Sequence, residues 1–197
     1  MDEQEYTAVD DDMGPLIYHR YFDLNLDDVV IFVEKYKNLN DLLYLACNND
    51  ETIDPTIYSI KKLIGTSNTR KAYLNYYYNN VKSFLENYTT TKCQCENINR
   101  FITVNYCGQT ISRLNVRIKS EDSVGSSSSV FLVVALQLMF GKSFKTRIIF
   151  GKGEVVALAK KFNKDVIQML ALLEWRAINQ YNSNITFFGA NIANPIN

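Results

Sequence analysis

The chain has 197 residues, of which 47% are hydrophobic and 21% are charged, with 21 basic and 21 acidic side chains. These proportions are typical of a globular protein, and they exclude a wholly disordered chain, a collagen and a disulfide-rich miniprotein. The zero net charge hides a division: residues 1–60 hold fourteen acids and three bases, a balance of −11, so residues 61–197 carry +11. This asymmetry favours a polyanion as the partner of the basic part; the alternative is that the two parts attract each other within one fold.

The N-terminal residues are acidic, and the longest apolar stretch, 130–140, is shorter than the ~20 residues that cross a bilayer. We therefore expect an intracellular protein of the cytoplasm or nucleus, neither secreted nor bound to a membrane. In that compartment the four cysteines, Cys47, Cys93, Cys95 and Cys107, are expected to be thiols. A zinc site is the alternative, but their spacing fits no standard finger, and we expect no metal and no cofactor.

The N-terminal half is predicted to be mostly helical. Residues 1–15 are polar and acidic and predict a flexible arm, while the aromatic segment 16–24 predicts a short strand or a docking segment. Residues 16–90 together predict a helical unit. Its helices begin after recognisable capping residues, which are Asn25 or Asp27, Asp54 before Pro55, and Thr69.

The pattern changes near residue 97, and we predict an α+β protein in which residues 97–182 form an antiparallel four-stranded sheet backed by a long C-terminal helix. Alternation predicts strands at 100–106 and 110–119, with a turn at 107–109, and a further strand at 144–150. Residues 130–140 fit either a buried strand or a helix capped by the preceding serines, and we favour the strand.

The C-terminal helix is predicted over about 154–181, although Asn163-Lys164-Asp165 could divide it in two. Its second half is apolar nearly all round, so it must be buried against the N-terminal unit or another subunit. This predicts a homo-oligomer, such as a dimer, with an interface that contains Ile167, Met169, Leu172 and Trp175. The Asn-rich tail, 183–197, is predicted to be loop.

Cations and aromatic side chains are expected to gather on the sheet face opposite the helix. That combination suits a single-stranded nucleic acid, because cations hold phosphates and aromatic rings stack on bases. The predicted nucleic-acid-binding residues are Phe101, Asn105, Arg113, Arg117, Lys119, Lys145, Arg147 and Lys152. The alternative is a plain solvated face that keeps the sheet soluble.

The segments 99–104 and 145–156 resemble the second strand, and the last strand and helix entry, of the Pur-alpha repeat, whose order of four strands and a helix also occurs in the Whirly proteins. This resemblance covers about 80 residues by pattern. It implies binding of single-stranded DNA or RNA on the sheet face and dimerisation through helices.

No catalytic motif stands out, and we predict a protein that is not an enzyme and has no small-molecule substrate. His19 is the only histidine, which leaves little material for acid–base catalysis, and Gly141-Lys142-Ser143 lacks the first glycine of a phosphate loop. The predicted function is non-catalytic binding of single-stranded nucleic acid. The alternative is a structural, assembly or host-interaction protein of viral type, because Asn, Tyr, Ile and Lys are abundant, as in AT-rich genomes.

Overall fold

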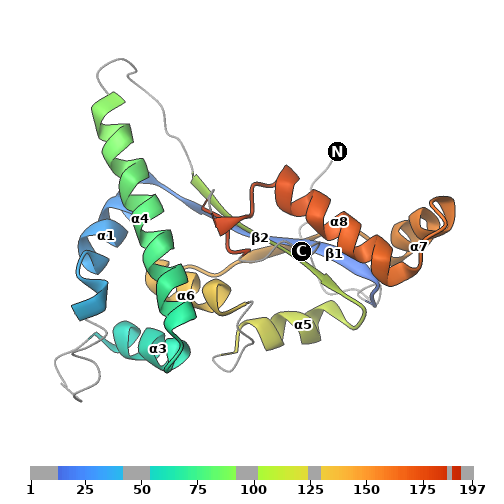
Figure 1. Cartoon of the computed structure of the whole chain (residues 1–197), viewed down its shortest axis with the longest axis horizontal. Helices are drawn as coiled ribbons and strands as arrows, with labels where there is room; N and C mark the ends of the chain where they lie inside the picture. Colours follow the sequence, from blue (N-terminus) through green and yellow to red (C-terminus); the bar gives the residue numbers. More distant parts are fainter. Residues whose placement is uncertain (1–12, 42–53, 92–101, 124–129, 186–187, 192–197) are drawn as a thin grey trace.

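A three-stranded antiparallel sheet organises the described part of the chain (Figure 1). The strands are β1 (Leu16–Leu24), β2 (Ile102–Thr110) and β3 (Lys145–Phe150), in the spatial order β2-β1-β3. The computed structural model describes residues 13–41, 54–91, 102–123, 130–185 and 188–191. The strand that was predicted as one of two possibilities for 16–24 is therefore confirmed, and it is the centre of the sheet.

The central strand β1 separates two hydrophobic cores. Because successive side chains of a strand point to opposite faces, Leu16, Tyr18 and Phe22 enter the larger core. Ile17 points to the other face of the sheet and enters the smaller core together with Cys107 of β2. The sheet is thus covered by helices on both faces, but to different extents.

The larger core is covered by α1 (Leu26–Tyr36), α3 (Pro55–Ile64), α4 (Asn68–Thr91) and α6 (Phe131–Phe140). Two of the predicted caps are confirmed, whereas the predicted start at Thr69 is wrong, because α4 already begins at Asn68. The Asn25 side chain accepts from the Asp28 amide at 2.8 Å, and the Asp54 side chain accepts from the Thr56 amide at 2.7 Å, with Pro55 in the first turn. Side-chain acceptors at these positions satisfy amides that have no partner inside the helix.

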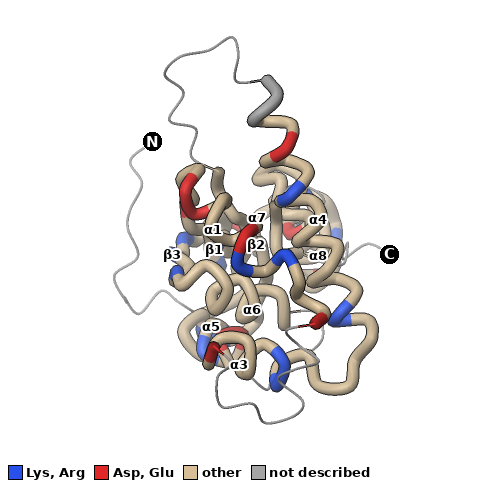
Figure 2. Tube along the Cα trace, turned by 90° about the vertical axis from the view of Figure 1, so that its left-hand side faces the viewer, with Lys and Arg blue, Asp and Glu red and all other residues tan. Residues whose placement is uncertain are grey.

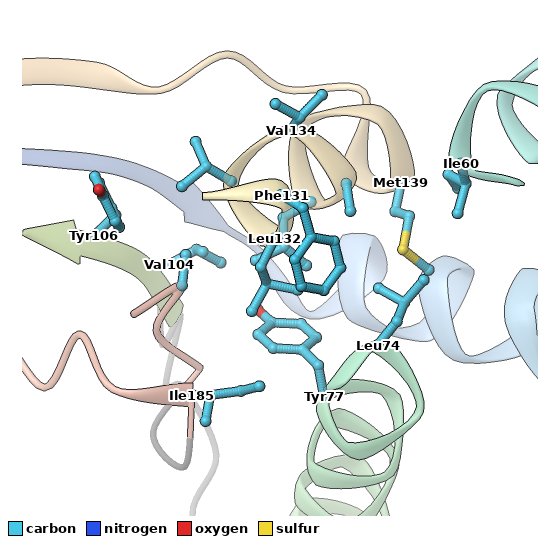
Figure 3. Close-up of a cluster of buried hydrophobic side chains, with 14 of the residues drawn as sticks. Ile60, Leu74, Tyr77, Val104, Tyr106, Phe131, Leu132, Val134, Met139 and Ile185 are labelled. Atoms are coloured by element: carbon cyan, nitrogen blue, oxygen red, sulfur yellow. The ribbon is translucent and has the colours of Figure 1, made fainter. Parts of the chain in front are cut away.

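The segment 130–140 is a helix, so the strand favoured from the sequence is wrong. Helix α6 ends at Phe140 and is followed by the C-cap Gly141, whose φ of 62° suits a glycine; its N-cap Val130 has no side-chain capping hydrogen bond. Figure 3 shows its side chains enclosed between the sheet and the helices α3 and α4. A segment surrounded on all sides has no polar face, and so its sequence carries no period to distinguish a helix from a strand.

The second predicted strand, 110–119, is also wrong. Strand β2 continues through the predicted turn at 107–109 to Thr110, and α5 (Leu114–Glu121) follows. The helix buries Leu114 and Glu121, and the Glu121 carboxylate accepts hydrogen bonds from Arg20 of β1 and Tyr106 of β2, at 3.2 and 3.0 Å. These partners are distant in sequence, so tertiary contacts override the local alternation.

The smaller core is covered by α7 (Lys152–Lys161) and α8 (Val166–Gln180). One continuous helix was predicted, with a division at 163–165 as the alternative, and the structure has the division. Asn163 has a φ of 50°, and the Asp165 side chain caps α8 by accepting from the Gln168 amide at 2.7 Å. Residues of α8 pack on Ile17 and Cys107, as Figure 1 shows for the helix as a whole.

The predicted fold class is therefore wrong in two respects. The described sheet has three strands in place of four, and the N-terminal segment does not form a separate helical unit, because β1 is the central strand of the sheet. Cys107 is a buried thiol, whereas Cys47, Cys93 and Cys95 lie outside the described residues. Within the described residues, every helix is too short or too polar to cross a bilayer.

Candidate functional site

The face of the sheet that α8 packs on is only partly covered. Exposure rises along β1 on this face: Ile17 and His19 are 0% and 2% exposed, Tyr21 is half-buried and Asp23 is exposed. Helix α8 ends at Gln180, and Tyr181, its C-cap, stacks on His19 with 4.2 Å between ring centroids. The second half of β1 therefore lies beyond the end of the covering helix.

Strand register determines which side chains share this uncovered area. Tyr21 is paired with Asn105 of β2 on one side and with Lys145 of β3 on the other. His19 is paired with Arg147 of β3 in the same way. Directly opposed residues of an antiparallel sheet point to the same face. We call the following set the open sheet face: Tyr21, Asp23, Thr103, Asn105, Lys145 and Arg147, with Tyr181 at its border.

A buried histidine fixes the geometry at the border of the open sheet face. His19 Nε2 lies 2.8 Å from Asn105 Oδ1, and Arg147 Nε donates to His19 Nδ1 at 3.1 Å. Because Nδ1 accepts, the proton is on Nε2 and the ring is neutral. The pKa of His19 is lowered to about 4, mainly by burial; the hydrogen bond to Asn105 opposes this shift and the Arg147 charge adds to it. The neutral ring therefore holds Arg147 and Asn105 in place.

Arg147 is placed between two aromatic rings. Its Cζ lies 5.3 Å from the ring centroid of Tyr21 and 5.2 Å from that of Tyr181. A guanidinium over an aromatic face is attracted by the ring quadrupole, and the plane of the group is then restrained. Tyr21 also stacks on His19, with 5.2 Å between ring centroids. The result is a half-exposed cluster of aromatic rings around a cation, beside the exposed Lys145.

The opposite face of the sheet holds a second polar cluster that is closed to solvent. Glu121 is 0% exposed and accepts from Tyr18, from Tyr106 at 3.0 Å and from Arg20 at 3.2 Å. Arg117 Nε lies 3.1 Å from the same carboxylate. Burial and the Glu121 charge raise the pKa of Tyr18 far above its ordinary value. This network ties α5 to the sheet, although among the described residues the buried Arg20 Nε has no hydrogen-bond partner.

The structure brings together only part of the predicted nucleic-acid-binding set. Asn105, Lys145 and Arg147 share the open sheet face. Arg117 and Lys119 belong to α5, and Arg117 contacts Tyr18, which points to the opposite face. The expected continuous face of cations from two separate strands is therefore wrong, and Figure 2 shows the basic positions spread over several sides.

Two other predicted residues, Arg113 and Lys152, also lie away from the open sheet face. Arg113 is the N-cap of α5 and forms an isolated bridge with Met13. Lys152 begins α7, beyond the end of β3 opposite to Lys145. Phe101 lies outside the described residues.

Sequence reasoning missed His19, Tyr21 and Tyr181. The alternation along β1 could have placed His19 and Tyr21 on one face, had 16–24 been taken as the central strand. Tyr181 follows the last turn of α8, and no local signal shows that its ring meets β1.

The predicted oligomer interface is partly exposed. Ile167, Leu172 and Trp175 of α8 are 70%, 38% and 42% exposed, whereas Met169 is buried in the smaller core at 4%. Met169 is therefore unable to contact another subunit in this fold.

The open sheet face carries aromatic, cationic and hydrogen-bonding side chains. Within the described residues, no three histidine, cysteine or acidic side chains converge on a point where they could hold a metal ion. The rings of Tyr21 and Tyr181 offer stacking, Lys145 and Arg147 offer positive charge, and Asn105 and Asp23 offer hydrogen bonds. Comparison of the chain with protein-family models, curated proteins and solved structures finds no match. The resemblance to the Pur-alpha repeat therefore stays a prediction.

Proposed function

We propose that this protein is a non-catalytic binder of single-stranded nucleic acid and that the open sheet face receives the strand. The observation that carries the proposal is the placement of Arg147 between Tyr21 and Tyr181 on a sheet face that α8 leaves half-exposed. Single strands require stacking surfaces for bases and cations for phosphates, and this cluster supplies both from two rows of the sheet and the end of α8.

The expected affinity is modest and nearly independent of sequence. Stacking on one ring contributes about 1–3 kcal/mol per base and accepts any base. Each phosphate contact by Lys145 or Arg147 adds a slope of about −0.7 in the dependence of log K on log salt. The half-exposed area spans the few residues of β1 that follow His19, which is enough for one or two bases.

The test is a titration of labelled single-stranded DNA, single-stranded RNA and duplex DNA with the full chain, at two salt concentrations. Lys145→Glu should weaken binding about tenfold on all single strands and reduce the salt slope by about 0.7 or more. Lys119→Glu is the matched control, because Lys119 is also exposed but lies on α5. Equal affinities of the two variants would refute the site.

The rings are tested by a second pair of variants. Tyr21→Ala removes a stacking surface and should weaken binding about tenfold or more, whereas Tyr21→Phe retains the ring and should bind as the wild type does. Because both variants keep the charge of the site, a loss confined to Tyr21→Ala shows that binding requires the aromatic ring of Tyr21.

A second candidate function, assembly with other protein subunits, is favoured by the exposed apolar residues of α8. It predicts self-association and no retention on oligonucleotides. The same titration separates the two candidates.

A further inference from the structure

Helix α8 has two apolar faces, and only one of them is covered. Met169, Leu170, Leu173 and Ala177 pack into the smaller core. On the outward side, Ile167, Ala171 and Trp175 follow one another at intervals of four residues, with Leu172 beside them. Ile167, Leu172 and Trp175 are 70%, 38% and 42% exposed. A helix that is apolar on both sides is normally buried on both sides.

The outward face has a charge pattern that is complementary to itself. Asp165 and Arg176 are both exposed and lie on the same flank of the apolar strip, next to Leu172, because eleven residues return a helix to nearly the same angle. The negative residue is at the N-terminal end of the helix and the positive residue is near its C-terminal end. Two such helices therefore attract each other when they run in opposite directions.

We infer that a second copy of this chain packs on the outward face of α8, antiparallel, about a two-fold axis at Ala171. Ile167 and Trp175 each lie four residues from Ala171, so Ile167 of one copy meets Trp175 of the other. Asp165 and Arg176 lie six and five residues from Ala171, on opposite sides of it along the helix. In an antiparallel pair related by a two-fold axis, the same flank of each helix faces its counterpart on the other. Asp165 of each copy therefore meets Arg176 of the other.

The small side chain at the axis supports this arrangement. Ala171 is half-buried and lets the two helix backbones approach closely, as large residues at that position would not. A single helix pair buries less than the area of a standard interface, so the dimer should be weak, with a dissociation constant of about 10–100 µM. The inference rests on the second candidate function, assembly, and is independent of nucleic-acid binding.

Sedimentation equilibrium of the full chain, from about 5 to 500 µM, should show reversible dimerisation. Trp175→Lys places a charge within the apolar strip, opposite Ile167 of the other copy, and should raise the dissociation constant about 100-fold. Ile31→Lys is the matched control, because Ile31 is 63% exposed on α1, and it should leave dimerisation unchanged. A chain that stays monomeric at the highest concentration would overturn both the assembly candidate and this inference.

The register is tested separately by charge. Arg176→Glu sets like charges against Asp165 at both ends of the pair and should raise the dissociation constant about tenfold. Adding Asp165→Asn should restore most of the affinity, because asparagine caps α8 as well as aspartate does and removes the repulsion. If Trp175→Lys disrupts the dimer but Arg176→Glu does not, or if Asp165→Asn gives no recovery, then the chain assembles in another register and the antiparallel arrangement is refuted.

Discussion

His19 makes the stability of this protein depend on pH in a way that can be measured at a single group. Burial lowers its pKa to about 4 in the folded state from an ordinary value of 6.5. Between these values the unfolded chain binds the proton and the folded chain does not, so acidification favours unfolding. The stabilising contribution is complete above pH 6.5 and is lost as the pH falls towards 4. The full pKa difference corresponds to about 3 kcal/mol in the free energy of unfolding, and His19 alone accounts for a loss of about 2 kcal/mol between pH 7 and 4.5.

Glu174 of α8 acts in the opposite direction over the same range. Burial raises its pKa to about 7, so the folded state binds the proton more tightly than the unfolded chain and acidification favours folding. The two groups partly cancel in the wild type. Glu174→Gln removes this compensation, and its free energy of unfolding should fall by about 2 kcal/mol more than that of the wild type between pH 7 and 4.5.

Urea denaturation at pH 7 and 4.5 measures these free energies of unfolding. His19→Gln removes the histidine in the same way as Glu174→Gln removes the carboxyl group. It keeps an amide donor and an acceptor at this position but has no titrating group, so its stability should fall less on acidification than that of the wild type. Since His19 is the only histidine, its imidazole resonances also report its pKa directly. An imidazole that titrates near 6.5 in the folded protein would refute the described burial and hydrogen bonding.

Three further substitutions test the fold by urea denaturation. Arg20→Met breaks the buried ion pair with Glu121 and should destabilise the protein by about 3–5 kcal/mol, whereas Lys37→Met at an exposed pair should cost less than about 0.5 kcal/mol. Phe131→Ala in the enclosed helix α6 should cost about 3–5 kcal/mol, and a cost below about 1 kcal/mol would contradict its complete burial. Gly141→Ala should cost about 1–2 kcal/mol, because a φ of 62° is unfavourable for alanine. No steric clash adds to this cost, because no neighbouring atom lies within 4 Å of the added carbon.

Elements with local signals were predictable from the sequence. Asn25, Asp54 and Asp165 each cap a helix with their own side chain, and such contacts join residues only two or three positions apart. The prediction was wrong where long-range contacts decide the structure. The alternation in 110–119 indicated a strand. In the structure, Glu121 instead accepts hydrogen bonds from β1 and β2, and these long-range contacts favour the helix α5.

The candidate site could be predicted only in part, for the same reason. Lys145 and Arg147 were correctly assigned to one strand, and Asn105 to another. Their common position depends on β1 lying between those two strands, and the pairing of Tyr21 with Asn105 joins residues 84 positions apart. Nothing near either residue in the sequence specifies that register, because the helices that enclose the larger core determine where β1 packs.

The distribution of ion pairs supports the proposal that a polyanion binds at the open sheet face and not at the predicted continuous face. On the covered face, Arg20 and Arg117 are both bound to Glu121, and at the start of α1 Lys142 pairs with Asp28 at 2.7 Å. A cation whose charge is already compensated attracts phosphate weakly. Among the described residues, Lys145 has no acidic side chain within ion-pair distance, and it lies opposite Tyr21 in the sheet. The count of cations in the sequence is therefore a poor guide, because the location of their carboxylate partners decides which of them can attract a phosphate.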